Sequence, residues 1–261
     1  MLKKLSLLFC CTAAALVTLC SCSDNRKANT FTVGFDAEFP PYGYVEKGVF
    51  KGFDLDLARE VAKRNNWKLV LKPINWDSKD MELNSGSIDC IWNGFTINGR
   101  EKAYEWSEPY VDNSQVVMLR KDSPVRKLAD LAGKVVAVQT DTPVMKAFQA
   151  KGKQEKLGKS FKRLVITPSY NNAVMELEVG SVDAVALDIG VARAKIAESK
   201  GKFIMLPETV ITEKYGIGFR KGNTALRDAV QKTFKEMVKD GTAAAISRKY
   251  FNGKDVLILK P

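Results

Sequence analysis

From Thr30 onward, short runs of β-branched and aromatic residues alternate with stretches whose apolar positions recur every three to four residues. The first pattern is typical of buried strands and the second of amphipathic helices, so the alternation predicts βαβ units and largely parallel sheets. We therefore expect an α/β protein. The predicted strands are Phe31–Phe35, Lys68–Ile74, Ile88–Gly94, Gln115–Arg120, Lys134–Gln139, Arg163–Thr167, Val182–Leu187, Phe203–Leu206 and Tyr215–Phe219.

The clearest helix is predicted over Asp54–Arg64, where leucine, alanine and valine positions form one apolar stripe. Asp54 is a suitable N-cap, and Asn65 and Asn66 end the pattern. We interpret this helix as a packing element.

An internal repeat indicates how the chain is organised. The segment Leu83–Ile91 returns as Leu177–Val185 at a constant offset of 94 residues. Each copy reads as a helix end, a Gly-Ser turn and a buried strand, which predicts two similar sheets and hence two lobes, unless a common unit recurs by chance. The same offset takes Gly94 onto Asp188, and both positions are expected at the carboxyl ends of equivalent strands, where open α/β sheets bind ligands.

The N-terminus has a different pattern. Lys3 and Lys4 precede the apolar run Leu5–Leu19, which ends in Leu-Cys-Ser-Cys at Cys22. This is the arrangement of an export signal, and its end resembles the lipobox of bacterial lipoproteins. We predict a signal peptide over residues 1–21 and lipidation of Cys22, with an ordinary signal peptide or a retained anchor as the alternatives.

Cleavage before Cys22 leaves only Cys22 and Cys90, so the mature chain has no intrachain disulfide and relies on its own core. Residues 22–29 are polar and read as a flexible tether between lipid and domain.

Composition narrows the chemistry further. The chain has 261 residues, 45% of them apolar, which excludes a disordered, collagen-like or polytopic membrane protein. It contains no histidine, so Ser-His and Cys-His catalysis and histidine metal ligands are excluded. We expect no metal and no cofactor. The formal charge of +11 raises nucleic acid as a partner, but the lysines are spread over predicted helices of an exported chain and fit a solvated surface better.

Several short motifs follow one another in a specific order, although each alone is weak: Val33–Tyr42, Gly52–Leu57, Gly86–Asp89, Gly94–Arg100, Trp106–Tyr110, Gly133–Gln139, Val182–Asp188, Tyr215–Asn223, Asp240–Thr242 and Lys249–Phe251. With this order and spacing, the chain from Phe31 to Phe251 resembles the family 3 solute-binding proteins of bacterial amino-acid ABC transporters.

The resemblance implies a two-lobed periplasmic-binding-protein fold of type II. Each lobe is expected to hold a mixed, mainly parallel sheet flanked by helices, and two crossovers form the hinge. Lobe 1 is expected over residues 31–110 and 215–261, and lobe 2 over residues 111–214. Such a protein closes on one amino acid and delivers it to a membrane permease. We expect a monomer at the periplasm or cell surface, held to the membrane by its lipid.

The family's positions for the backbone of an amino acid fall on four residues. The carboxylate-binding arginine falls on Arg100, whose planar guanidinium suits bidentate binding. The α-ammonium partner falls on Asp188, with the Gly94 carbonyl and the Thr96 hydroxyl as further acceptors. The alternatives are a surface pairing of Arg100 with a nearby glutamate and a helix N-cap role for Asp188.

Positions around the ligand's side chain fall on Asp36, Phe39, Phe53, Asn93 and Gln139. Both phenylalanines suit a hydrophobic core equally well, and Asp36 also suits a turn beside the Pro-Pro pair. A carboxylate at a strand end favours a ligand side chain with a hydroxyl, amide or cation.

The sequence departs from the family pattern at two loops. The approach to Arg100 is one residue shorter than usual, and Gly99 eases a tight turn there. The anion loop of lobe 2 usually reads Gly followed by two Ser or Thr, whereas this chain has Asp141, Thr142 and Pro143. Proline lacks an N–H, so one backbone donor is lost. The loop still reads as a helix start capped by Thr142 or Asp141, and Thr142 is kept as a candidate carboxylate contact.

These observations favour a lipid-anchored receptor for a polar amino acid, with no enzymatic activity. The alternative is an enzyme on the same fold, similar to the cyclohexadienyl dehydratases, in which Arg100 would hold a substrate carboxylate and Asp36 or Asp188 would act as the acid.

Overall fold

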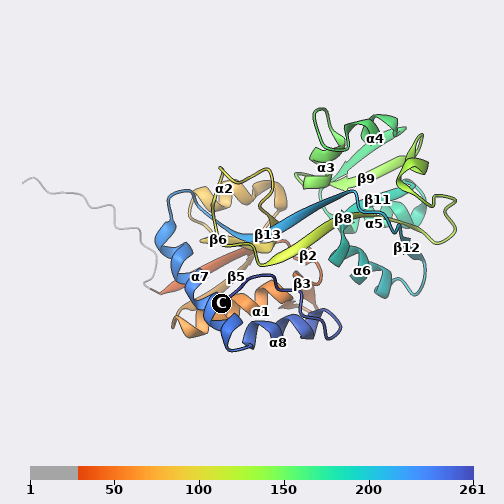
Figure 1. Cartoon of the computed structure of the whole chain (residues 1–261). Helices are drawn as coiled ribbons and strands as arrows, with labels where there is room; N and C mark the ends of the chain where they lie inside the picture. The colour runs from red at the N-terminus through yellow and green to blue at the C-terminus, as the bar shows by residue number, and fades with distance from the viewer. Residues whose placement is uncertain (1–28) are drawn as a thin grey trace, which may run out of the picture.

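Two lobes make up the part of the chain that the computed structural model describes, residues 29–261 (Figure 1). The predicted signal peptide, Cys22 and all but the last residue of the predicted tether lie outside these residues. The long strands β8 (Val111–Arg120) and β13 (Ile211–Phe219) run from one lobe to the other. None of the helices in residues 29–261 is long and apolar enough to cross a membrane.

The first lobe is built from two segments distant in sequence. Its elements are β1 (Thr30–Phe35), β2 (Glu38–Phe39), β3 (Gly43–Glu46), β4 (Val49–Lys51), α1 (Phe53–Arg64), β5 (Lys68–Pro73), the short helix η1 (Trp76–Ser78), α2 (Lys79–Asn84), β6 (Cys90–Thr96), β7 (Glu105–Trp106), α7 (Thr224–Lys239) and α8 (Thr242–Tyr250). The second lobe is continuous in sequence between the two long strands. Its elements are η2 (Leu128–Leu131), β9 (Val135–Gln139), α3 (Pro143–Phe148), α4 (Glu155–Ser160), β10 (Arg163–Thr167), α5 (Tyr170–Val179), β11 (Ala184–Asp188), α6 (Ile189–Glu198) and β12 (Phe203–Met205).

One curled sheet passes through both lobes in the order β10-β9-β11-β8-β13-β6-β1-β5, with β12 on β8 and β7 on β13. In the first lobe β1 is parallel to β5 and β6, and in the second β9 is parallel to β10 and β11. The long strands are antiparallel to their neighbours. The prediction of a two-lobed α/β protein with mixed, mainly parallel sheets is confirmed.

The crossover between lobes is a short antiparallel ladder. Strand β8 pairs with β13 from Val111 opposite Tyr215 to Gln115 opposite Ile211. Beyond this ladder β13 pairs with β6 in the first lobe, and β8 pairs with β11 and β12 in the second. The lobes are thus connected by two hydrogen-bonded strands, which restricts their relative motion to bending and twisting at this ladder.

Helix α1 begins one residue earlier than predicted and ends as predicted, so its N-cap is Gly52, and the predicted N-cap role of Asp54 is wrong. Asp54 and Asp56 lie in its first turn and Lys63 and Arg64 in its last, so the charges complement the helix dipole. Its apolar face is fully buried against the sheet. Each such leucine or valine contributes about 1.5–3 kcal/mol to folding.

The internal repeat corresponds to two equivalent units. In each unit a helix ends before a glycine in the left-handed region, at Gly86 (φ 76°) and Gly180 (φ 82°). The aspartate three residues later then accepts a backbone N–H at the start of the neighbouring parallel strand. Asp89 accepts from Thr32 at 2.7 Å, and Asp183 accepts from Val135 at 2.8 Å. In each lobe, therefore, the repeated segment binds a neighbouring parallel strand through an equivalent aspartate.

Each predicted strand is present, but the predicted strand set was incomplete. Strands β8 and β13 each begin four residues earlier than predicted, and the small sheet β2-β3-β4 and strand β7 were not predicted. The added halves of β8 and β13 alternate between buried and exposed positions, since they cross between lobes and only one face is covered. They therefore lack the continuous apolar run that marks the other strands.

Candidate ligand-binding site

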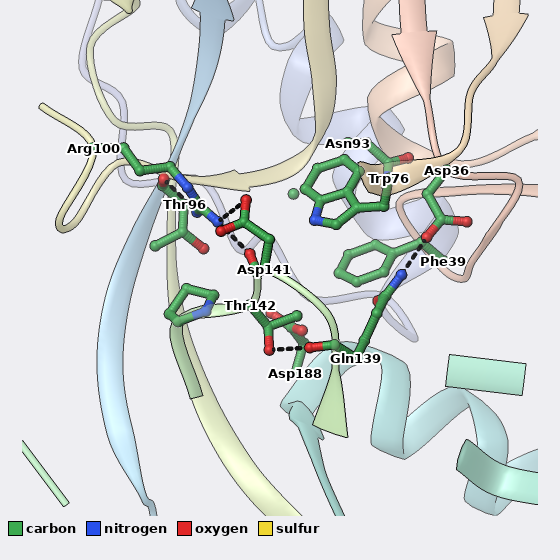
Figure 2. A pocket seen from close by; sticks show the side chains of 12 residues that line it. Asp36, Phe39, Trp76, Asn93, Thr96, Arg100, Gln139, Asp141, Thr142 and Asp188 are labelled. Atoms are coloured by element: carbon green, nitrogen blue, oxygen red, sulfur yellow. Dashed lines mark hydrogen bonds and ion pairs between the residues drawn. The ribbon is translucent and has the colours of Figure 1, made fainter. Parts of the chain in front are cut away.

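A cavity between the lobes collects most of the predicted site residues. It encloses about 310 Å³, counting the part open to solvent. The walls come from the ends of β1, β5, β6, β9 and β11 and from the segments that follow them (Figure 2). The lining residues are Asp36, Phe39, Trp76, Asn93, Gly94, Thr96, Arg100, Gln139, Asp141, Thr142, Pro143 and Asp188.

Arg100 provides the positive charge of the cavity. Its side chain is 8% exposed, and the guanidinium lies 5.1 Å from the centre of the Phe95 ring. Nη1 donates to the Thr96 carbonyl at 3.3 Å, and Nη2 donates to the Asp141 carbonyl and lies 3.2 Å from Asp141 Oδ2. The alternative of a surface pairing with a nearby glutamate is wrong, because the partner is an aspartate of the opposite lobe.

Asp141 follows β9 in the left-handed conformation, with φ 46°. Its carboxylate contacts Lys79 as well as Arg100, and Lys146 Nζ lies 2.6 Å from Oδ1. Partial burial raises the pKa of Asp141, but the three cations outweigh burial and lower it well below its usual range.

Thr142 caps α3, as the alternative interpretation of this loop proposed. Its hydroxyl donates to the Gln139 carbonyl at 2.7 Å and accepts from the Met145 N–H at 3.4 Å. Pro143 is the first residue of α3, where its missing N–H costs no helical hydrogen bond. The hydroxyl proton of Thr142 is thus used within the loop, although the side chain lines the cavity.

Asp188 provides a negative charge on the opposite lobe from Arg100. It is 3% exposed at the end of β11. Its Oδ1 accepts from Asn113 at 2.7 Å, from Gln115 at 2.8 Å and from the Tyr215 hydroxyl, and its Oδ2 accepts from Tyr170 at 2.9 Å. Burial raises its pKa, and the tyrosine hydroxyls oppose that shift. It occupies the N-cap position of α6 without a capping bond, and it lines the cavity.

Glu213 is a second buried carboxylate beside Asp188, and it was not predicted from the sequence. Its Oε1 accepts from Asn113 and Gln115, each at 2.6 Å, so the two acids share the same amide donors. Burial, together with repulsion from Asp188, raises the pKa of Glu213 to about 8. No lysine or arginine within residues 29–261 forms an ion pair with either acid.

Gly94 approaches the aromatic wall closely, in the left-handed conformation with φ 57°. A Cβ there would lie 2.8 Å from Cε1 of Phe39 and 3.0 Å from Cε2 of Tyr215, so glycine is required. Its N–H donates to Oδ2 of Asp54 at 2.5 Å. Asp54 is fully buried, and burial raises its pKa to about 7 against the effect of that bond.

Asp36 lies at another edge of the cavity. Its Oδ2 accepts from Gln139 of the opposite lobe at 3.0 Å, and its Oδ1 accepts from the Glu38 N–H at 2.8 Å. Asp36 therefore stabilises the turn that follows β1 and also lines the cavity. Burial raises its pKa, and the Gln139 bond opposes this. The rings of Phe39 and Trp76 lie on the same side of the cavity (Figure 2).

Nine of the ten predicted ligand contacts line the cavity, and Phe53 does not. Its ring is fully buried at the start of α1, with ring centres 5.2 Å from Phe251 and 6.4 Å from Tyr42. The core interpretation of Phe53 is the one that fits this position. Trp76 was not predicted, although it follows β5 by three residues, and a position beyond a strand's carboxyl end is a usable signal.

Comparison with known proteins places the chain in a family. The model of the bacterial extracellular solute-binding proteins, family 3, matches residues 31–253. The chain belongs to this family. The resemblance read from the motifs is confirmed, and the match covers both lobes and the entire cavity of this solute-binding protein.

Individual relatives of the solute-binding protein are named for amino acids that they bind. The L-cystine-binding protein TcyJ of Escherichia coli is 29% identical over 235 residues, covering 88% of this chain and 85% of TcyJ. The substrate-binding protein of an ABC uptake transporter from Streptococcus pneumoniae with bound histidine is 30% identical with a TM-score of 0.83, covering 88% of this chain and 95% of that one. The arginine-, lysine-, histidine-binding protein ArtJ of Geobacillus stearothermophilus is 31% identical with a TM-score of 0.76, covering 86% and 96%.

These relatives are binding proteins, and the comparisons do not support the dehydratase-like alternative. Among the residues that line the cavity, Arg100 belongs to the first lobe, and Asp141 and Asp188 belong to the second.

Proposed function

We propose that this solute-binding protein takes up one free polar amino acid between its lobes and presents it to the permease of an ABC importer. Binding and lobe closure constitute its entire activity. The observation that carries this proposal is that Arg100 of the first lobe and Asp188 of the second line the same cavity. A zwitterion can satisfy both only when the lobes come together, so ligand binding stabilises the closed arrangement.

Residues 31–110 and 215–261 act as lobe 1 in this proposal, and residues 111–214 act as lobe 2. The ladder between β8 and β13 supports boundaries at these positions, because each strand changes partners on either side of it. Bending at the ladder would open the cavity without disturbing the sheet inside either lobe.

The ligand's α-carboxylate is expected at Arg100, where two parallel N–H donors of the guanidinium face it. Its α-ammonium is expected at Asp188, with the Gly94 carbonyl and the Thr96 hydroxyl as further acceptors. Gln139 and Asn93 contribute hydrogen-bonding groups beside the side chain. Arg100 is essential in this scheme, since lysine would supply the charge without the fork.

The opposite edge of the cavity favours a ligand whose side chain carries a positive charge. Asp36 forms no ion pair with any lysine or arginine in residues 29–261, and the faces of Phe39 and Trp76 suit a planar cation. Arginine, lysine and histidine, named for the relatives, meet this requirement. Cystine would bring a second carboxylate to this edge, and no cation lines the cavity there to receive it.

We further propose that the protein is exported and lipid-anchored at Cys22. It then acts as a monomer at the periplasm or cell surface. The support for export and anchoring is the basic, apolar and Leu-Cys-Ser-Cys order of residues 1–22. Replacement of Cys22 by serine is expected to abolish incorporation of a labelled fatty acid and to leave the protein unanchored. Labelling that persists in this variant would contradict lipidation at Cys22.

The test of binding uses residues 23–261, unfolded and refolded to remove carried-over ligand. The melting temperature is measured against the twenty amino acids and cystine. A ligand at about 100 times its Kd stabilises the protein by about 2.7 kcal/mol, which gives a clear upward shift. We expect a shift with basic amino acids that is lost in Arg100→Ala and strongly reduced in Arg100→Lys.

Asp36→Asn tests the assignment of the charged edge separately. This variant keeps the size and polarity of the side chain, so a selective loss of the basic ligands is expected. Absence of any shift with all the compounds would refute the amino-acid receptor. Equal shifts in the wild type and Asp36→Asn would refute only the preference for a cationic side chain.

A further inference from the structure

An ion pair between the lobes lies beside the cavity and has no role in the proposed binding scheme. Lys79, the first residue of α2, is 2% exposed. Its Nζ contacts Oδ2 of Asp141 on the opposite lobe, and lies 5.3 Å from the centre of the Trp76 ring. A lysine is almost never buried to this extent unless it is paired.

Asp141 is held by cations from both lobes. Lys79 and Arg100 reach it from the first lobe, and Lys146 reaches it at 2.6 Å from its own lobe. Arg100 also donates to the backbone carbonyl of Asp141, which fixes the loop that carries the carboxylate. Lys146 orients the carboxylate, and the two cations of the first lobe connect it across the cavity.

We propose that Asp141 is an interlobe latch, which through Lys79 and Arg100 raises the fraction of the empty protein whose lobes are closed. The inference rests on the proposed function to the extent that it concerns the closing motion of a receptor. It adds a residue that controls how often the empty cavity opens.

The physical basis is the difference in solvent exposure between the closed and open arrangements. In the closed arrangement the Lys79 side chain is 2% exposed and the Asp141 side chain 29%, and opposite charges attract more strongly in such a partly buried site than at an exposed surface. Besides the contacts of Lys79 and Arg100 with Asp141, the bond between Gln139 and Asp36 crosses this part of the cavity, and it has only one charged partner. The Lys79–Asp141 pair is therefore a main electrostatic link between α2 and the loop after β9.

The Asp141 carboxylate also contacts the Arg100 guanidinium, which is the group expected to bind the ligand's carboxylate. Asp141 Oδ2 lies 3.2 Å from Nη2 of Arg100. A ligand carboxylate entering the cavity must share or displace this contact. Breaking the latch is therefore expected to speed ligand association, because the cavity opens more often and Arg100 is free, and also to speed dissociation, because closure is weaker.

The opening itself is measured by energy transfer between dyes at Met81→Cys on α2 and Met175→Cys on α5. Both positions are highly exposed, at 67% and 64%, and one lies on each lobe. Residues 23–261 contain no other cysteine than Cys90, which is fully buried and will not react. The protein is first freed of ligand by unfolding and refolding, as above.

We expect higher transfer in the empty wild type than in Lys79→Met and in Asp141→Asn. Lys79→Met leaves the contact between Arg100 and Asp141 in place, whereas Asp141→Asn removes the charge that both cations contact, so the double variant is expected to match Asp141→Asn. Lys79→Arg keeps the charge and is expected to retain high transfer. Arg64→Met is the matched control, because it breaks the 2.6 Å pair between Arg64 and Asp240 within the first lobe, and it is expected to leave transfer unchanged.

Two outcomes overturn the latch: transfer that is equally low in the empty wild type and the variants, and transfer that stays high when Lys79 or Asp141 is replaced. A melting curve confirms that each variant is folded. Failure of the receptor proposal gives a different result. The wild type would then respond to no amino acid, while the comparison of the empty proteins would still show whether the latch exists.

Once a ligand is identified, the association and dissociation rate constants of Asp141→Asn are expected to rise together by about 5- to 20-fold. The free energy that corresponds to this change lies within the range of interaction energies between residues in contact. A merely destabilising substitution would not accelerate association.

Discussion

Replacement of Gly190 by alanine introduces one methyl group between the lobes. Gly190 is the second residue of α6 in the second lobe. A Cβ there would lie 2.8 Å from both Cε2 and Oη of Tyr42 and 3.1 Å from its Cζ, and Tyr42 belongs to the first lobe. The Tyr42 ring is itself confined, with ring centres 5.2 Å from Tyr215 and 5.5 Å from Phe39.

The methyl group therefore cannot be accommodated by moving the ring alone, and α6 must shift away from the first lobe. Overpacking of this kind costs about 1–3 kcal/mol. If that cost falls on the closed arrangement, ligand affinity drops by about 5- to 150-fold. Within α6 the effect has the opposite sign, because Gly190 has no positive φ and alanine favours a helix over glycine by about 1 kcal/mol.

The expected result is a marked loss of ligand affinity with little change in the melting temperature of the empty protein. Isothermal titration calorimetry with the ligand found in the melting screen measures the first, and calorimetry of the empty protein measures the second. Ser199→Ala, at the other end of α6, serves as a control away from Tyr42. An affinity of Gly190→Ala within twofold of the wild type would refute the argument that this contact must tighten when the lobes close.

Four other substitutions test the cavity and the residues packed around it. Glu213→Gln is expected to flatten the pH dependence of stability. The pKa of Glu213 is about 8 in the folded state and about 4.3 in the unfolded state, so between these pH values the folded state binds one proton more than the unfolded state. The stability of the wild type therefore falls as pH rises, by up to about 1.4 kcal/mol per pH unit. Denaturant unfolding between pH 5 and 9 checks this, and equal slopes in variant and wild type would contradict it. Phe53→Leu is expected to lower the melting temperature and leave ligand affinity unchanged, whereas Phe39→Leu should weaken binding; titration of both variants distinguishes a core ring from a ligand-facing one. Gly94→Ala, which combines a left-handed backbone with contact against two rings, is expected to destabilise the protein by about 2–4 kcal/mol, measured by denaturant unfolding.

The sequence predicted the sheet of each lobe well because its central strands are continuous apolar runs with turn residues at their ends. It did not predict the first halves of β8 and β13, where polar residues alternate with buried ones. Positions such as Asp36, Arg100 and Asp188 were identified because the order of motifs fixed them relative to strand ends. Their partners were not, since pairing depends on how the lobes approach each other.

Glu213 and Lys79 illustrate this limit. Each is a charged residue in a segment that reads as exposed, yet each is at least 97% buried once the lobes and the crossing strands are assembled. No local pattern distinguishes them from the many solvated acids and lysines of the chain. Phe53 shows the converse, because an aromatic residue beside a strand end suits the core and a ligand cavity equally well.

Strand β13 has a consequence for how the protein becomes folded. It lies between β6 and β8, so the first lobe cannot complete its sheet until residues more than 100 positions downstream of β6 are available. Contacts of such long separation slow folding. By contrast, β9, β10 and β11 follow one another closely and can assemble early. If residues 1–22 direct export of the unfolded chain, as proposed above, this order delays completion of the first lobe's sheet until the C-terminal part of the chain has crossed the membrane.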